Sequence, residues 1–131
     1  ARVVAAEDSA PEEEEGLPDE ARLLKQCADD PELVEELLGL FAAGLNAAAA
    51  ALNHAIDAND RETWRRAAHK LRGEAATLGF QRLSGVLQQL ESQAASPDQS
   101  VPGDLCDALA EAIAGCRLWL RRRTQEVPHD R

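Results

Sequence analysis

The residues that could do chemistry gather around one histidine, His69. On a helix wheel with about 100° per residue, His69 falls roughly 160° from Leu71, so its ring is predicted to face solvent. Imidazole is partly neutral near pH 7, and its free nitrogen is then a nucleophile. Four bases lie close to it along the same helix: Arg65, Arg66, Lys70 and Arg72. Such a ring suits a phosphoryl group carried on nitrogen, because the bases would neutralise the phosphoryl oxygens.

Two small residues follow the histidine at helical spacing. Gly73 lies four residues and Ala76 seven residues after His69, so both share or border its face. Glycine inside a helix costs about 1 kcal/mol relative to alanine, so its presence needs a reason. Close approach of another molecule is one such reason. The same face also carries a positive charge. From Arg61 to Gly73 there are five bases and one acid, a local +4 in a chain of net charge −10.

The other candidate groups have simpler interpretations. His54 is expected near a helix end and His129 in a tail, and neither has basic or small neighbours that would make it a site. Any one of Arg65, Arg66 and Lys70 could equally be part of a solvated helix face. The run 121–123, three arginines, is expected to interact with the dipole of its helix or to aid solubility.

Length and charge bound the possible functions. The chain has 131 residues, enough for one domain. Its net charge of −10 argues against nucleic-acid and anionic-membrane partners. No apolar run approaches the roughly 20 residues of a membrane span, so membrane insertion is not expected. Residues 1–21 hold eight acids against Arg2, or −7, which leaves only −3 for the remainder.

Sequence patterns give no sign of an autonomous enzyme. There is no glycine-rich phosphate loop, G-x-S-x-G, H-E-x-x-H or cluster of metal ligands, and nothing resembles an ATP-binding region. Cys27, Cys106 and Cys116 are odd in number and widely spaced, which predicts reduced structural thiols in a cytosolic protein. The sequence has no methionine and no signal peptide, so we expect an excised piece, the C-terminal domain of a longer chain.

The elements that must position His69 are predicted to be helices. A short helix is expected over 18–28, followed by a long one with Asp30 as N-cap and Pro31 at its first position. The next begins at Asn59 or Asp60 and ends before Gly79. Two more are expected at about 80–95 and 104–124, joined by a loop at 96–103. In the long helix the predicted core positions are Leu33 or Val34, Leu37, Phe41, Leu45, Ala48, Leu52 and Ile56.

Composition sets the fold class. There are 25 alanines and 18 leucines against 11 residues of Val, Ile and Thr together, so helix formers dominate. The sequence therefore predicts an all-α protein, an antiparallel up-down four-helix bundle with a short extra N-terminal helix. Residues 1–16 are expected to be a flexible acidic linker, 17–125 the bundle and 126–131 a tail.

The residues around His69 resemble a known family. The run Ala68-His69-Lys70-Leu71-Arg72-Gly73-Glu74-Ala75 is followed by Leu78-Gly79-Phe80, Leu83 and Leu90-Glu91. This pattern is similar to the histidine-containing phosphotransfer (HPt) domain of bacterial phosphorelays, over about residues 18–124. Two positions depart from the family: Arg72 stands where lysine is usual, and Phe80 where a small residue is common. We expect Phe80 to pack at the helix junction.

The resemblance implies a specific function. His69 would accept a phosphoryl group, on Nε2, from the aspartate of a receiver domain and pass it to a second receiver. Arg72 would support the phosphoryl group and Gly73 would leave space. The protein would need no cofactor of its own, because Mg²⁺ would belong to the receiver. It would be monomeric and cytoplasmic, typically within a hybrid sensor kinase. The alternative is a helical adaptor that docks a receiver or another partner without phosphorylation.

Overall fold

The computed structural model describes residues 16–96 and 101–126, the side chains of 124–126 excepted, and all of its regular structure is helical. The helices are α2 (Glu20–Gln26), α3 (Pro31–Asp57), α4 (Arg61–Leu78), α5 (Gln81–Ala94) and α6 (Gly103–Glu126). The all-α prediction is confirmed. The predicted linker and tail lie outside the described residues except for Gly16 and Glu126 at their inner ends.

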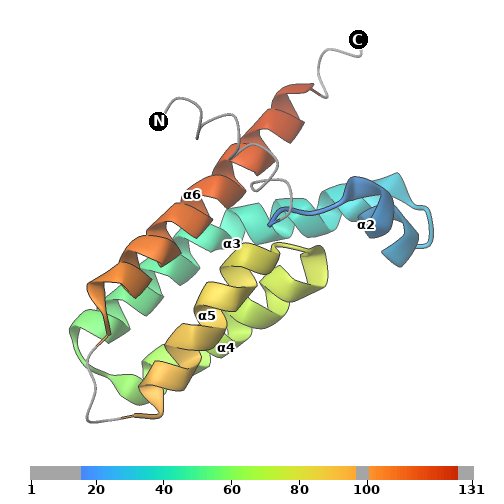
Figure 1. Ribbon diagram of the computed structural model, residues 1–131. Coiled ribbons are helices and arrows are strands. Elements are labelled where there is room, and N and C mark those ends of the chain that lie inside the picture. Colours follow the sequence, from blue (N-terminus) through green and yellow to red (C-terminus); the bar gives the residue numbers. More distant parts are fainter. Residues whose placement is uncertain (1–15, 97–100, 127–131) are drawn as a thin grey trace.

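Four of the helices form an up-and-down bundle (Figure 1). Helices α4 and α5 make a tight antiparallel hairpin that packs against the longer α3 and α6, and α6 closes the bundle on α3. The short α2 lies beside the part of α3 that extends beyond the hairpin. This is the predicted bundle with an extra N-terminal helix, and it leaves one side of α4 uncovered.

The helix ends follow from local chemistry. The Asp30 carboxylate accepts hydrogen bonds from the amides of Glu32 (3.0 Å) and Leu33 (3.4 Å), and Pro31 follows it as predicted. Asp60, rather than Asn59, caps α4 through the amide of Thr63. Asn59 takes a left-handed conformation, with φ of 56°, in the turn before the cap. Gly79 ends α4 at φ 99°, a conformation that glycine adopts without strain.

The buried face of α3 is rotated slightly from the predicted one. Leu37, Ala48 and Ile56 are only partly buried. The fully buried positions are Val34, Leu38, Phe41, Leu45, Ala49, Leu52 and Ala55. Apolar residues lie on both sides of this helix, so spacing alone does not determine which of two adjacent residues faces the core. The displacement leaves Leu37 on the margin of the bundle next to α4.

Phe80 forms the centre of the packing where α4 meets α5. It is fully buried, stacks on Phe41 with 4.8 Å between ring centroids, and meets Trp119 edge-on at 5.5 Å. Trp64, also buried, donates from Nε1 to the carbonyl oxygen of Leu90 at 2.8 Å. The expectation that Phe80 packs at the helix junction is confirmed. The Trp64 hydrogen bond joins α4 to α5, and the ring contacts of Phe80 hold the junction of these two helices against α3 and α6.

By length and composition, α3 is long and apolar enough to cross a membrane, contrary to our expectation that no segment approaches that limit. Its alanines count as apolar although many of them are exposed in the bundle. A core helix of a water-soluble bundle passes the same test, and α3 supplies Leu38, Leu45 and Leu52 to the core. The helix alone is therefore weak support for a membrane span.

Arg123 joins three helices. Its guanidinium binds Glu20 of α2 through Nε (2.7 Å) and Glu35 of α3 through Nη2 (2.6 Å), and it lies over the Trp119 ring. Hydrogen bonds to Glu35 and Glu20 outweigh burial and raise the pKa of Arg123 above its ordinary value. The prediction of a dipole partner or solubilising charge is therefore wrong for Arg123, which fastens α2 to the bundle.

Candidate functional site

His69 lies midway along α4 on the side that no other helix covers. Its side chain is 59% exposed, which confirms the position predicted from the helix wheel. The opposite side of the same turn is anchored by Ala68 and Leu71, both buried in the core. The backbone below the ring is therefore held rigidly, while the ring itself is accessible to another molecule.

A carboxylate from the neighbouring helix binds one nitrogen of the ring. Glu91 of α5 places Oε2 2.8 Å from His69 Nδ1. An ionised carboxylate can only accept hydrogen bonds, so the proton must lie on Nδ1. Neutral imidazole carries one N–H proton, and Nε2 is then left with its lone pair. The geometry therefore selects the tautomer in which Nε2 is the nucleophilic atom.

Arg72 completes a three-residue cluster with His69 and Glu91. Its Nε donates to Glu91 Oε1 at 2.9 Å, and its Nη2 lies 3.2 Å from His69 Nδ1. Guanidinium has no acceptor and Nδ1 already carries a proton, so this last approach is a contact rather than a hydrogen bond. Glu91 thus orients the ring through one oxygen and the guanidinium through the other.

The charge of Glu91 is maintained by these two neighbours. Its side chain is only 21% exposed, and the desolvation raises the pKa of the carboxyl group. Hydrogen bonds from His69 and Arg72, together with the positive charge of Arg72, outweigh that effect and hold the pKa of Glu91 below its usual range. Glu91 is therefore ionised at neutral pH, as the tautomer assignment requires.

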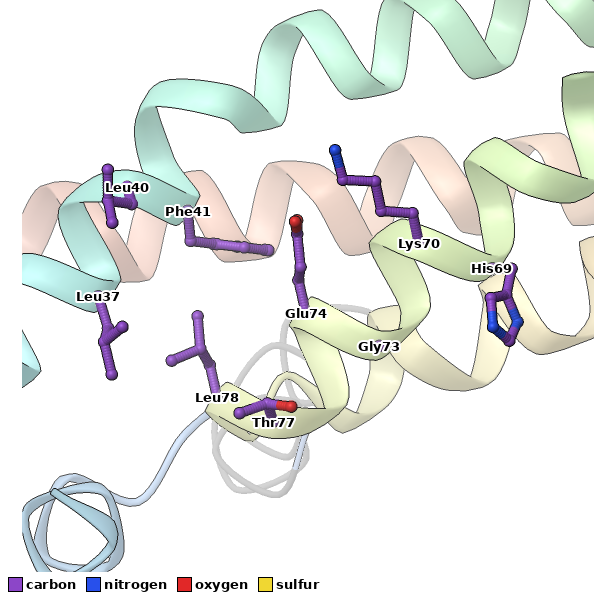
Figure 2. Close-up of a pocket in the computed structure, with 9 residues that line it drawn as sticks. All are labelled: Leu37, Leu40, Phe41, His69, Lys70, Gly73, Glu74, Thr77 and Leu78. Carbon is purple, nitrogen blue, oxygen red and sulfur yellow. The ribbon is translucent and has the colours of Figure 1, made fainter.

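An open groove of about 590 Å³ runs from His69 toward α3 (Figure 2). One side is α4, with Lys70, Gly73 and Glu74, and the other is α3, with Leu37, Leu40 and Phe41. Leu40 is 65% exposed and does not contribute to the core, so it adds apolar surface to the groove. Ala76 lies elsewhere: it lines a second groove, of about 500 Å³, between the end of α4 and α2.

Gly73 leaves the surface beside the ring bare. A Cβ atom built on it would meet nothing within 4 Å, so no contact within the described chain requires glycine there. The same residue lines the groove and is exposed. Gly44 on α3 is equally open, so openness alone does not explain the glycine, and the role of Gly73 in making room for another molecule stays a prediction.

The four predicted bases do not act alike. Arg65 and Arg66 both reach Glu62, at 3.1 and 3.5 Å, in exposed pairs worth about 0–1 kcal/mol. Arg72 is held by Glu91. Lys70 points from α4 toward the α3 side of the groove, and within the described ranges it makes no ion pair (Figure 2). Of the four bases, Arg72 therefore contacts the ring and Lys70 lines the groove.

The sequence analysis assigned no functional role to Glu91, Leu37 or Leu40. A signal for Glu91 was present, because Leu90-Glu91 belongs to the pattern that the chain shares with HPt domains. Nothing in the pattern separates Leu40 from a core leucine, and Leu37 was predicted to be core. His54 contributes to none of the contacts around His69. His129 lies outside the described residues.

The cysteines and potential metal ligands complete the inventory. All three cysteines are free thiols, and burial raises the pKa of Cys116 to about 12, which makes it unreactive. Within 16–96 and 101–126, no group of three His, Cys, Asp or Glu side chains is placed to hold a metal ion.

A comparison with models of known protein families identifies a family for this chain. The family model described as "Hpt domain" matches residues 36–119, well over half of the chain. The matched range includes α4, α5, most of α3 and the whole His69–Glu91–Arg72 cluster. No curated protein and no solved structure matched the chain.

Proposed function

This chain belongs to the Hpt domain family, whose members carry phosphoryl groups in phosphorelays, and on that basis we propose that His69 is the phosphorylated residue. The observation that carries the proposal is the 2.8 Å contact between Glu91 and His69 Nδ1, which leaves the exposed Nε2 as the nucleophile. Family membership supports a phosphocarrier rather than a kinase.

The transfer would use the cluster as follows. The Nε2 lone pair attacks phosphorus of an aspartyl phosphate on a receiver domain, an Nε2–P bond forms, and the bond from phosphorus to the aspartate oxygen breaks. The ring becomes positively charged while Nδ1 keeps its proton, and Glu91 stabilises that charge. The reverse steps deliver the group to a second receiver. Mg²⁺ would belong to the receiver, and this chain needs no cofactor of its own.

Arg72 would interact with both negatively charged groups of the reaction, the Glu91 carboxylate and the phosphoryl group. Its Nη2 lies 3.2 Å from His69 Nδ1 while its Nε is bound to Glu91, so the guanidinium lies against the Nδ1 side of the ring that would carry the phosphoryl group. Arginine presents several donors in one plane and can bind a carboxylate and a phosphoryl oxygen at once. Arg72 would therefore hold Glu91 before transfer and contact the phosphoryl group after it.

The receiver would dock over the groove between α3 and α4. Leu37 and Leu40 offer an apolar surface next to His69, and Lys70 borders it with a positive charge. A receiver presents its aspartyl phosphate in an acidic pocket, so it would place an apolar patch on the leucines and negative charge toward Lys70 and Arg72. Gly73 would let the two backbones approach closely.

The alternative is an adaptor that docks a receiver or another partner without phosphorylation. The exposed groove would serve it equally well, whereas the cluster of His69, Glu91 and Arg72 would then have no use. We further propose that the domain acts as a monomer in the cytoplasm. Its attachment to a hybrid kinase and the direction of phosphoryl flow belong to the same proposal.

The deciding experiment offers the protein a phosphorylated receiver and a small donor, phosphoramidate, in separate reactions. We expect label on the wild type from both donors and on neither with His69→Gln. The matched control is His54→Gln, which should be labelled like the wild type. The phosphate should be acid-labile and base-stable. Equal labelling of the wild type and His69→Gln, or no label on the wild type with several receivers, would exclude the proposal.

A further inference from the structure

Three exposed arginines lie on α6, a helix that packs mainly against α5 and α3 rather than α4. Arg117, Arg121 and Arg122 are exposed, and in the described part of the chain none of them makes an ion pair. Leu118 between them is 40% exposed. We call these four residues the basic face of α6. Helical spacing directs them away from Arg123, which faces Glu20 and Glu35.

The proposed phosphotransfer does not use this face. The family match ends at residue 119, so Arg121 and Arg122 lie beyond it. In a chain of net charge −10, three exposed arginines without a carboxylate partner among the described residues are a strong local excess of positive charge. Such a patch attracts an anionic segment through interactions that salt screens.

The chain enters the described structure beside this same helix. The carbonyl oxygen of Gly16 accepts from the Arg82 amide at 3.4 Å, and a Cβ on Gly16 would lie 2.9 Å from Arg82 Cβ. Gly16 and Leu17 border a small hollow, about 30 Å³, whose α6 lining is Glu111, Ala112, Gly115 and Cys116. The first described residues thus contact α5 and share a hollow with the turn of α6 that directly precedes Arg117 in the sequence.

The residues immediately before Gly16 are the most acidic of the chain. Glu12 to Glu15 are four consecutive glutamates, preceded by Glu7 and Asp8. Four extended residues span roughly 13 Å. From Gly115 to Arg122, α6 rises roughly 10 Å. Charge, length and point of entry therefore all match the basic face.

We propose that the acidic run Glu12–Glu15 docks on the basic face of α6 as an intramolecular strap. The four carboxylates would pair with Arg117, Arg121 and Arg122 and cover Leu118. The strap would lead the preceding chain along α6, and it would keep the acidic run from competing for the bases beside His69. The inference does not depend on phosphorylation, so it stands or falls separately from the proposed function.

A zero-length carbodiimide crosslink between a carboxylate and an amine tests the strap. The natural chain has only two lysines, Lys25 and Lys70, besides its terminal amine. The substitution Arg121→Lys keeps the charge and adds an amine to the basic face. Lys70, on the groove beside His69, then serves as an internal reporter for docking at the opposite site. The full 131-residue chain is crosslinked in dilute solution, and the linked peptides are identified by mass spectrometry.

We expect residues 12–15 to link to the introduced amine severalfold more than to Lys70, and the yield to fall severalfold in 1 M salt because the Debye length shrinks to about 3 Å. Adding Arg117→Gln and Arg122→Gln should lower the yield severalfold. Arg65→Gln with Arg66→Gln removes the same charge from α4 and should leave the yield unchanged. Links mainly to Lys70, links between two chains, or equal loss in both double variants would overturn the strap.

Discussion

At the scale of single residues, the proposed reaction depends on which nitrogen of His69 carries the proton. Bulk water leaves both tautomers of imidazole available, so exposure alone makes His69 only a weak candidate. The carboxylate of Glu91 removes that ambiguity from a neighbouring helix and also holds Arg72 in place. The site is therefore a cluster of three side chains.

Glu91 provides the sharpest test of this cluster. Glu91→Leu removes a hydrogen bond to a charged group, worth about 1.5–3 kcal/mol, so phosphoryl transfer should slow about 10- to 100-fold. Glu91→Gln keeps an acceptor for Nδ1–H and should slow transfer less. Nitrogen NMR of the ring should show Nδ1–H retained with Gln and mixed tautomers with Leu. Glu62→Gln, a carboxylate on the same face of α4, is the control; a tautomer change there, or none with Leu, would contradict the positioning role.

The depressed pKa of Glu91 also predicts a dependence of stability on pH. A carboxyl group whose pKa is lowered by folding stabilises the fold above its ordinary range, and this contribution disappears as the pH falls through the folded-state value. Unfolding midpoints measured from neutral to acidic pH should therefore drop less steeply for Glu91→Gln than for the wild type. Parallel curves for the two proteins would show that the ion pair does not contribute.

Substitutions at Gly73 should have different effects on stability and on phosphoryl transfer. Because a Cβ would meet nothing within 4 Å, Gly73→Ala should stabilise the fold by up to about 1 kcal/mol in chemical denaturation. Gly73→Leu should also fold, yet block transfer from a receiver while phosphoramidate still labels His69. Gly44→Ala, at a similarly open site on α3, should stabilise the protein without affecting transfer. Normal receiver transfer in Gly73→Leu would refute the space-making role.

At the scale of elements, the α4–α5 hairpin carries the reacting cluster and α3 carries the apolar side of the groove. The hairpin brings His69 and Glu91 together although 22 residues separate them in the sequence. Phe80 and Trp64 are buried on its inner side, and their contacts hold the backbone that carries His69 and Glu91 on the outer side. Helix α3 adds the apolar side of the groove, which Leu37 and Leu40 line beside α4.

The leucine most exposed in that groove should matter for docking and not for folding. Leu40→Asp should weaken receiver binding and slow receiver-dependent labelling at least about tenfold, because it buries an unpaired charge in the interface. Labelling by phosphoramidate and the unfolding midpoint should hardly change, since Leu40 is 65% exposed. Leu33→Asp, another exposed leucine on α3 but outside the groove, is the control. Equal losses in both variants would argue against this groove.

At the scale of the whole molecule, ion pairs and the separation of positive and negative charge add to the packing of the core. The core joins the four long helices and takes in Leu23 of α2, and Arg123 adds ion pairs that secure α2 to α3 and α6. The proposed strap would extend this arrangement to the acidic segment before Gly16. The overall −10 thus coexists with two positive surfaces, one beside His69 and one on α6.

Arg123 should therefore control the attachment of α2. Its side chain is only 14% exposed and binds two carboxylates, so Arg123→Met should cost about 1–3 kcal/mol of unfolding free energy. Amide hydrogen exchange should accelerate in α2 more than in α4. Labelling of His69 by phosphoramidate should be unaffected. Arg22→Met, at an exposed arginine on α2 itself, should change little; equal exchange in α2 for both variants would rule out the tie.

The sequence by itself determined the helices, the bundle, the caps at Asp30 and Gly79 and the exposure of His69. These features depend on local chemistry and on a spacing of 3.6 residues per turn, which a single chain displays directly. It also showed the pattern that identified the family. Only the tertiary structure decided that Glu91 selects the tautomer, that Leu37 and Leu40 line a groove, and that Arg123 binds α2. Those contacts join residues from different helices, and their partners are fixed by how the helices rotate and pack, which no spacing within one helix records.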